Sequence, residues 1–258
     1  MDLLNLLGLG LAAFLAGAVN AVAGGGTLIT FPSLYAFYPA KIANMTSTVA
    51  IWPGTVGGSL AYRKEIGERS TRLKLLAVPS IAGGLAGAVL LRVSSDAVFS
   101  WVVPFLIIFA ALILASNARL SKLAARAGIA AEHEAHIPVG MFVTMFFIGI
   151  YGGYFGAGVG ILMLAGISIL APDDLQHSNA VKGVLGMLIN FTAVVVFFVS
   201  GQVELLPAGV MAVCSIGGGY GGVSIARRLN ANLLRGIIVA WGLFMGTFLL
   251  LKQLGVFG

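Results

Sequence analysis

Two glycine clusters hold the backbone groups of this chain that could bind a ligand. The first is Gly24-Gly25-Gly26-Thr27 and the second is Gly156-Ala157-Gly158-Val159-Gly160. Glycine costs about 1 kcal/mol relative to alanine inside a helix, so such clusters interrupt a helix. A helix that restarts inside a membrane has free N–H groups at its first turn, and these can hold an anion. Close helix packing through small residues is the alternative, but two clusters at matching positions favour a binding site.

A short polar segment follows each cluster. It reads Asn44-Met45-Thr46-Ser47-Thr48 in the first half and Ser178-Asn179-Ala180-Val181-Lys182 in the second. Asn and Ser are good N-caps, so capping alone is one interpretation. Lys182 lies about one turn into an apolar helix, where burying a cation in the membrane costs free energy and therefore indicates a functional role. The alternative is that its long side chain carries the ammonium to the membrane interface. One cation among N–H and O–H donors suits a small oxyanion.

Other residues carry weaker signals. His133 and His136 could bind a metal, but a solvated loop explains them better. Ser47 with Lys182 could form a nucleophile pair, although nothing in the sequence places the two in contact. We therefore expect no enzyme activity, no metal and no cofactor. Five further residues could line a pathway, although kinks and packing explain them equally well: Gly17, Asn20, Pro32, Pro53 and Asn190.

The acidic residues avoid the apolar segments of the chain. All nine Asp and Glu residues fall in expected loops or near chain ends. A cation pathway or a carboxylate proton relay normally needs an acidic group inside the membrane. The distribution argues against a cation pump and leaves an anion or a neutral solute as the substrate.

The elements that position these residues must be apolar helices. Of the 258 residues, 59% are hydrophobic and 9% are charged, whereas about 25% are charged in a soluble domain. The single cysteine, Cys214, excludes a disulfide framework. The net charge of +6 does not indicate nucleic-acid binding, because the basic residues lie between apolar runs, where they orient a membrane protein. The composition predicts an all-α polytopic protein surrounded by a lipid bilayer.

Ten apolar runs can be followed along the chain. They fall at about 3–23, 26–38, 44–62, 75–91, 98–115, 138–156, 158–171, 178–200, 205–226 and 233–251. The runs at 26–38 and 158–171 are short and each follows glycines. The expected organisation is a first transmembrane repeat at 1–116, a polar connecting loop at 117–137, and a second transmembrane repeat at 138–258. Each repeat would have a glycine-broken, re-entrant first helix and three transmembrane helices.

An ordered series of matches indicates that the halves are related. Asn44 corresponds to Asn179, and the glycines at 83, 84 and 87 correspond to those at 218, 219 and 222. If the chain re-enters at each glycine cluster, the repeats are inverted, with eleven basic residues on one side and three on the other. A parallel arrangement gives nine and five. The positive-inside rule therefore favours inverted repeats, a cytoplasmic connecting loop and periplasmic termini.

Longer stretches around the glycine clusters carry a resemblance. The first is Gly17-Ala18-Val19-Asn20-Ala21-Val22-Ala23-Gly24-Gly25-Gly26-Thr27, followed by Phe31-Pro32 and Asn44-Met45-Thr46-Ser47. The second is Gly149-Ile150-Tyr151-Gly152-Gly153-Tyr154-Phe155-Gly156-Ala157-Gly158-Val159-Gly160, followed by Asn179-Ala180-Val181-Lys182. With these motifs the chain resembles the TauE/SafE sulfite exporter family, also called the TSUP transporters. The resemblance implies a bacterial inner-membrane permease for sulfur-containing or organic anions such as sulfite or sulfoacetate.

The resemblance also implies which residues bind the substrate: Gly24, Gly25, Gly26, Asn44, Ser47, Gly156, Gly158, Asn179 and Lys182. We expect alternating access at a midplane site between the two glycine breaks. The alternatives are a passive anion or solute channel and a membrane assembly factor without transport activity. The expected partners are the small anion and the bilayer, with no nucleic acid. The oligomeric state is open, with a homo-oligomer among the options, as are the anion, the direction of transport and any coupling ion.

Overall fold

The computed structural model is a bundle of helices. It describes residues 1–22, 25–60, 63–128, 137–171, 173–226 and 231–256. The helices of this described part are α1 (Leu3–Val22), α2 (Thr27–Tyr35), α3 (Ala40–Leu60), α4 (Arg63–Glu68), α5 (Ser70–Val93), α6 (Asp96–Gly128), α7 (Val139–Tyr154), α8 (Val159–Leu170), α9 (Leu175–Val199), α10 (Leu205–Ala226) and α11 (Ala231–Gln253). No strand occurs among these residues. The all-helical expectation is confirmed.

Each of the ten apolar runs corresponds to a helix, and the remaining helix is α4. Its six residues, Arg63-Lys64-Glu65-Ile66-Gly67-Glu68, are too polar and too few to show an apolar period. Helix α6 continues past its apolar run to Gly128, because charged residues are also compatible with a helix and can extend it beyond the lipid. Among the described residues, five helices are long and apolar enough to cross a membrane, namely α1, α5, α6, α9 and α11.

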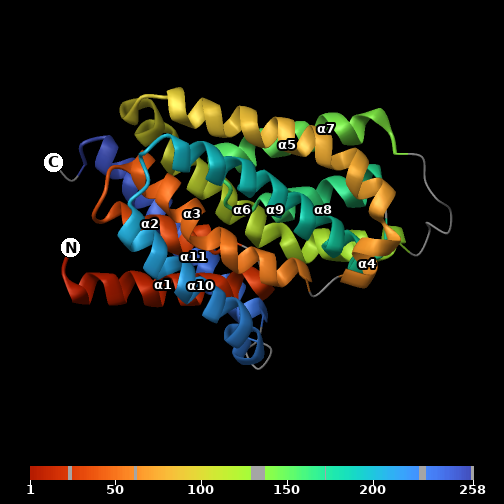
Figure 1. Ribbon diagram of the computed structural model, residues 1–258, viewed down its shortest axis with the longest axis horizontal. Helices are drawn as coiled ribbons and strands as arrows, with labels where there is room; N and C mark the ends of the chain where they lie inside the picture. The colour runs from red at the N-terminus through yellow and green to blue at the C-terminus, as the bar shows by residue number, and fades with distance from the viewer. Residues whose placement is uncertain (23–24, 61–62, 129–136, 172, 227–230, 257–258) are drawn as a thin grey trace.

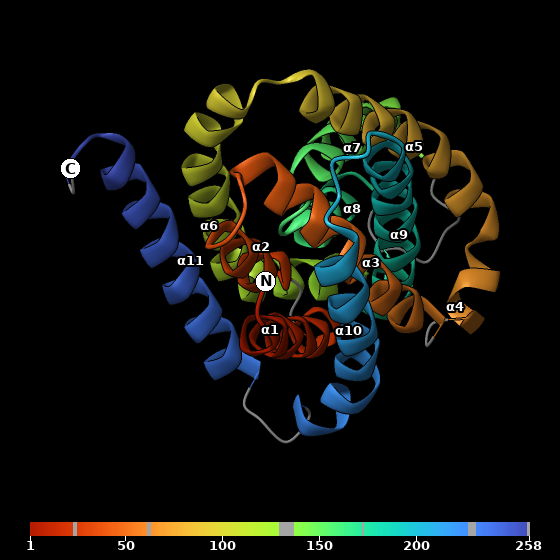
Figure 2. The ribbon, with the colours of Figure 1, turned by 60° about the vertical axis from the view of Figure 1, so that its left-hand side comes forward.

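The bundle has two distinct ends (Figure 1). Both termini lie at one end, together with the turns that join α5 to α6 and α9 to α10. Helix α4 lies at the opposite end, where α7 begins after the connecting segment. Helices α1 and α7, which start the two halves, therefore begin at opposite ends of the molecule. A second view, in Figure 2, shows α11 at the edge of the bundle, where it packs against α6.

Each half contributes its first helix to a close contact with the other half. Helix α1 packs along α10, and α7 packs along α5. A side chain at Gly218 would clash with the carbonyl oxygen of Phe14, and one at Gly83 would clash with that of Phe146. These two contacts occupy corresponding positions of the halves. Gly218 therefore lies on the face of α10 that packs against α1.

The starts of α3 and α9 are both fastened to α5. Lys41 donates from Nζ to the carbonyl oxygens of Arg92 (2.7 Å) and Ser94 (2.9 Å), at the end of α5. Asp173, just before α9, instead accepts hydrogen bonds from Arg69 and Arg72, at the start of α5. The start of α3 is thereby held at one end of the bundle and the start of α9 at the other.

Candidate functional site

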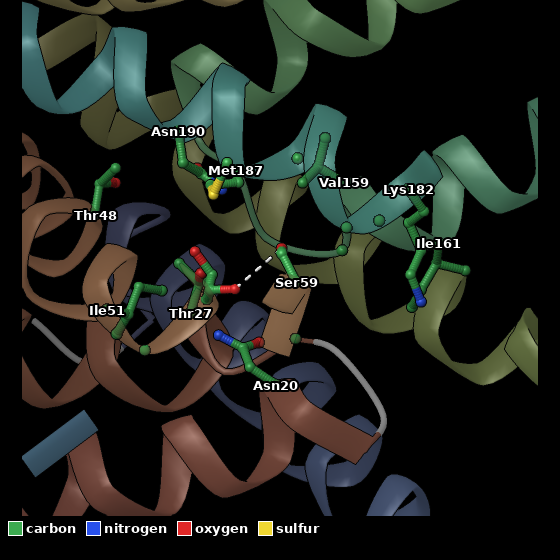
Figure 3. A pocket seen from close by; sticks show the side chains of 18 of the residues that line it. Asn20, Thr27, Thr48, Ile51, Ser59, Val159, Ile161, Lys182, Met187 and Asn190 are labelled. Carbon is green, nitrogen blue, oxygen red and sulfur yellow. Dashed lines mark hydrogen bonds between the residues drawn. The ribbon is translucent and has the colours of Figure 1, made fainter. Parts of the chain in front are cut away.

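A cavity of about 200 Å³ lies where the two glycine breaks meet (Figure 3). Its walls are formed by the end of α1, the start of α2, the middle and end of α3, the turn between α7 and α8 with the start of α8, and the first two thirds of α9. The lining residues are Asn20, Gly25, Thr27, Thr48, Ile51, Gly54, Thr55, Ser59, Phe155, Gly156, Gly158, Val159, Gly160, Ile161, Asn179, Lys182, Gly183, Gly186, Met187 and Asn190. Both halves of the chain therefore contribute to one cavity.

The first break is held together by a side chain of α1. Gly25 has a φ of +88°, which side-chain-bearing residues rarely adopt, and α2 restarts at Thr27. The N–H of Gly26 donates to Oδ1 of Asn20 at 2.7 Å. Gly25 and Thr27 line the cavity, so the first turn of α2 faces it.

The second break also has glycines of positive φ and is also held by a side chain of the preceding helix. Gly156 and Gly158 have φ values of +82° and +75°, and α8 restarts at Val159. The hydroxyl of Tyr151 donates to the carbonyl oxygen of Ala157 at 2.6 Å and satisfies an acceptor that the break frees. Helix α8 has no side-chain cap at its first turn, which lines the cavity. The N–H groups of Val159 and Ile161 in this turn donate to the carbonyl oxygens of Gly156 and Gly158, so it is the positive end of the helix dipole that favours an anion here.

Lys182 is the basic side chain of the cavity lining. Its Nζ donates to Oδ1 of Asn179, one turn earlier on α9, at 2.8 Å. Its stem lies against Gly160, where an added Cβ would come within 3.3 Å of Cδ. Figure 3 shows the side chain reaching from α9 past Ile161. Among the described residues, no carboxylate oxygen lies within 4.0 Å of this ammonium.

The rest of the cavity wall is neutral. Asn20 and Asn190 lie on opposite sides, and Thr48, Thr55 and Ser59 present hydroxyls along α3. Each of these three hydroxyls donates to a carbonyl oxygen of α3, and a hydroxyl can rotate to donate to a ligand instead. Apolar side chains complete the lining. This wall can hold one small anion through a single cation and several neutral donors.

The structure brings five of the predicted site residues to the cavity: Gly25, Gly156, Gly158, Asn179 and Lys182. Gly26 lies beside it and uses its N–H to bind Asn20. Gly24 lies outside the described residues. Whether any of these residues binds a substrate stays a prediction.

Asn44 and Ser47 are not among the residues that line the cavity. Asn44 is fully buried, and its Nδ2 donates to the carbonyl oxygen of Tyr154 at 3.0 Å. Its Oδ1 has no hydrogen-bond partner among the described residues. Ser47 and Thr30 share a hydrogen bond of 2.6 Å between their hydroxyls. In this structure the two residues join α3 to the neighbouring helices.

Several lining residues were not predicted. Thr48, Thr55 and Ser59 recur at intervals of seven and four residues, which places them on one face of α3. That periodicity was visible in the sequence. Asn20 and Asn190, weighed as pathway residues, do line the cavity.

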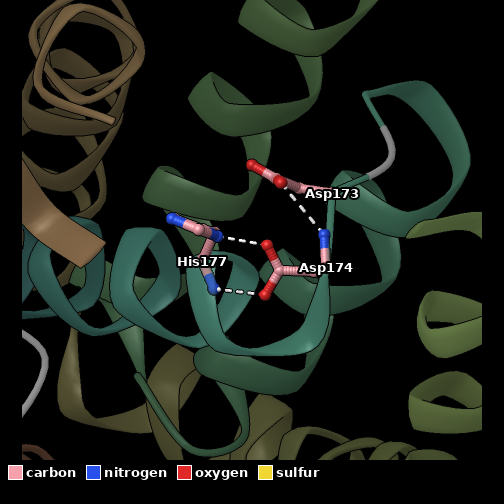
Figure 4. Close-up of side chains that lie close together, drawn as sticks. All are labelled: Asp173, Asp174 and His177. Atoms are coloured by element: carbon pink, nitrogen blue, oxygen red, sulfur yellow. Dashed lines mark hydrogen bonds and ion pairs between the residues drawn. The ribbon is translucent and has the colours of Figure 1, made fainter. Parts of the chain in front are cut away.

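A charged cluster lies at the start of α9, and Figure 4 shows three of its members, Asp173, Asp174 and His177. Arg69 binds Asp173 through Nε and Nη2 at 2.7 and 2.9 Å, and Arg72 binds it at 2.9 Å. Burial opposes ionisation of Asp173, but the hydrogen bond from Arg69 and the charges of both arginines hold its pKa below the usual value. His177 lies between Asp174 and Glu68.

The same cluster contains the carboxylates and imidazole that could hold a metal ion, namely Asp173, Asp174 and His177. The oxygens of Asp173 are already bound by two guanidinium groups, and both ring nitrogens of His177 face carboxylates. The arrangement is that of an ion-pair network that ties α9 to α4 and α5. The pair His133 and His136 lies outside the described residues.

Five apolar helices of membrane-spanning length and a cavity between two broken helices define a multi-pass membrane protein with an internal site. The chain belongs to the sulfite exporter TauE/SafE family, whose model matches residues 9–249. It is 25% identical over 241 residues to a probable membrane transporter protein of Haemophilus influenzae, covering 93% of this chain and 92% of the relative. The protein is thus a membrane transporter.

Two further relatives support this assignment. The chain is 28% identical over 231 residues to the probable membrane transporter protein ORF9 of Sinorhizobium sp, covering 88% of this chain and 85% of the relative. It is 26% identical over 246 residues to the probable membrane transporter protein YfcA of Escherichia coli K12, covering 94% and 88%. Among solved structures, none matches the chain significantly.

Proposed function

We propose that the protein carries a small sulfur-containing or organic anion across the bacterial inner membrane by alternating access. The observation that carries the proposal is the meeting of both glycine breaks at one cavity with a single lysine. Two helix starts and one ammonium provide positive potential, and the described lining contains no carboxylate to oppose it. The name of the matching family, sulfite exporter, supports a sulfur oxyanion as the substrate.

We further propose that the two halves are inverted repeats that rock against each other. Helices α1 and α7 begin at opposite ends of the bundle, and corresponding glycines form the contacts of α1 with α10 and of α7 with α5. Such repeats place a substrate site at their interface and expose it to each side in turn. Arg63, Lys64 and Lys74, near the α4 end, support a cytoplasmic location for that end and a periplasmic location for the termini.

A ligand screen tests the proposed function. The purified protein in detergent is heated with sulfite, sulfate, thiosulfate, sulfoacetate, taurine or simple carboxylates, and the melting temperature is recorded. A ligand at 100 times its dissociation constant adds about 2.7 kcal/mol of stability, which corresponds to roughly 5 to 11 °C. One class of anion should raise the melting temperature selectively.

Two lysine variants make the screen specific to the cavity. Lys182→Met should remove the shift, whereas Lys252→Met, the same change at an exposed position near the end of α11, should retain it. The best ligand is then followed as uptake into proteoliposomes. Saturable uptake supports a carrier, flux that never saturates supports a channel, and absence of both binding and flux overturns the transport proposal.

A further inference from the structure

Lys182 is the cation of a cavity whose described lining holds no other ionisable side chain. We propose that Lys182 binds the co-transported proton, so that one monovalent anion crosses the membrane together with one proton. This inference rests on the proposed function, and it names the coupling ion and the group that carries it.

The first argument is the absence of a fixed counter-charge. Lys182 has the amide oxygen of Asn179 as its hydrogen-bond partner, and the described lining residues contain no Asp or Glu. An ammonium inside a membrane protein is costly without a paired negative charge. The loaded site meets this requirement because the anion is the counter-ion. The empty site can meet it only if the lysine releases its proton.

The second argument is that the described ionisable side chains on the surrounding helices are engaged elsewhere or do not line the cavity. On α9 and α4, His177 faces Asp174 and Glu68. On α5 and before it, Arg72 and Arg69 bind Asp173. Three further groups whose side chains are described on helices packed against α9 have partners: Lys41 of α3 binds carbonyl oxygens of α5, Tyr151 of α7 binds Ala157, and Tyr154 of α7 packs on Phe99. The others do not line the cavity: Arg63, Lys64 and Glu65 of α4, Lys74 and Arg92 of α5, and Asp96 of α6.

The transport cycle then balances in charge and protons. On the side of uptake, the free amine of Lys182 takes a proton from water while the anion enters beside it. The site reorients as a neutral pair of ammonium and anion. On the other side the anion leaves, the N–H bond breaks, and the proton passes to water. The site returns empty and neutral, so the net movement is one anion and one proton in the same direction.

A permanently charged lysine predicts a different transporter. If Lys182 kept its proton throughout, the empty site would hold an unpaired ammonium and would not reorient. The protein would then exchange one anion for another and give no net uptake. Net uptake and exchange therefore separate the two mechanisms.

Proteoliposomes loaded with a pH-sensitive dye provide the test, with methanesulfonate as the probe. Methanesulfonate is the anion of a strong acid and carries no proton of its own in the neutral range, so any proton movement belongs to the protein. Valinomycin with potassium sets the membrane potential. We expect acidification of the lumen by one proton per methanesulfonate taken up, a rate at least tenfold higher with an inward proton gradient, and no dependence on membrane potential. Protein-free vesicles are the blank.

The matched variant is Lys182→Arg, because a guanidinium stays protonated at all accessible pH values. We expect it to keep exchange of labelled for unlabelled methanesulfonate and to lose net proton-coupled uptake. Lys252→Arg should behave as the wild type. Net uptake by the wild type without proton movement, exchange by the wild type with no net uptake, or uptake that follows the membrane potential overturns the inference and leaves the proposed function intact. Absence of both exchange and uptake in the wild type overturns the proposed function for sulfonates, and the inference with it.

Discussion

The starts of α3 and α9 occupy corresponding positions in the two halves, but their polar residues have different roles. At the start of α9, Asn179 and Lys182 face the cavity and bind each other. At the start of α3, Asn44 binds the backbone of α7 and Ser47 binds Thr30 of α2. The same plan of helix, break and polar helix start therefore yields an open wall in one half and a sealed contact in the other.

The difference locates the cavity along the molecule. The cavity is lined by the end of α1, the end of α3 and the start of α9, which places it toward the end of the bundle that holds α4. The contacts of Asn44 and Ser47 lie nearer the end that holds the termini, together with the packed rings of Phe31 and Phe155. The two halves are therefore alike in their helix contacts and differ in whether the polar helix start lines the cavity.

The largest expected effect concerns the contacts in which the halves are alike. Gly218→Ala and Gly83→Ala each push a Cβ into a backbone carbonyl of the facing helix, which costs about 3 kcal/mol. We expect each to lower the melting temperature in detergent by roughly 6 to 12 °C. Gly209→Ala, on the same helix as Gly218 but with no atom within 4 Å, should leave it unchanged. Unequal losses for Gly218 and Gly83 would show that the two contacts are not equivalent.

The next effect separates the two asparagines. Asn179→Ala removes the partner of Lys182 at the cavity wall, and we expect anion affinity to fall about tenfold, as for a lost hydrogen bond next to a charge. Asn44→Ala should instead lower stability by about 1–3 kcal/mol and change affinity little, because its amide joins α3 to α7. Binding isotherms and melting curves on both variants check this. A loss of affinity confined to Asn44→Ala would place the anion at the sealed end.

A smaller effect concerns the hydroxyl pair between α2 and α3. Ser47→Ala removes the bond to Thr30 and should cost about 1 kcal/mol, or roughly 2 to 4 °C in melting temperature. Transport kinetics should stay near those of the wild type if Ser47 does not contact the substrate. Ser33→Ala is the matched control, since its hydroxyl donates within its own helix. A large rise in KM for Ser47→Ala would contradict this comparison.

The smallest effect is a dependence on pH at the start of α9. Because the pKa of Asp173 is lowered in the folded protein, its ion pairs stabilise the fold above the unfolded pKa, and this contribution is lost as pH falls through the folded pKa. Asp173→Asn should therefore flatten the fall in melting temperature between neutral and acidic pH. Asp2→Asn, an exposed carboxylate at the N-terminus, should not. An unchanged pH profile in Asp173→Asn would show that the arginine pairs add nothing.

The sequence predicted the helices better than their ends. Long apolar runs mark lipid-facing or buried helices directly, so each run corresponds to a helix. Helix α4 was missed because six mostly polar residues show no period. Within the site, Lys182 was identifiable because a cation in an apolar run is conspicuous. The spacing of Thr48 and Thr55 places them on one helical face with Ser59, but it did not single them out, because a hydroxyl in an apolar helix usually hydrogen-bonds to its own backbone, as both do here.

The separation of Asn44 from the cavity could not be predicted for a different reason. Its local sequence is as polar as that around Asn179, and both follow a glycine break. Only the packing of α7 against α3 decides that the Asn44 amide meets the carbonyl of Tyr154. A contact between residues so far apart in the chain depends on the whole bundle and leaves no local signature.

The pairing of α1 with α10 and of α5 with α7 also bears on how the chain is made. While the first half is being synthesised, α1 and α5 enter the bilayer without the helices against which their glycines fit. Helix α5 gains its partner only when α7, which begins at Val139, has been inserted, and α1 only when α10 has followed. The glycine faces stay exposed to lipid until then, so the first half expressed alone would be a substrate for membrane proteases, and co-expression of the second half would protect it.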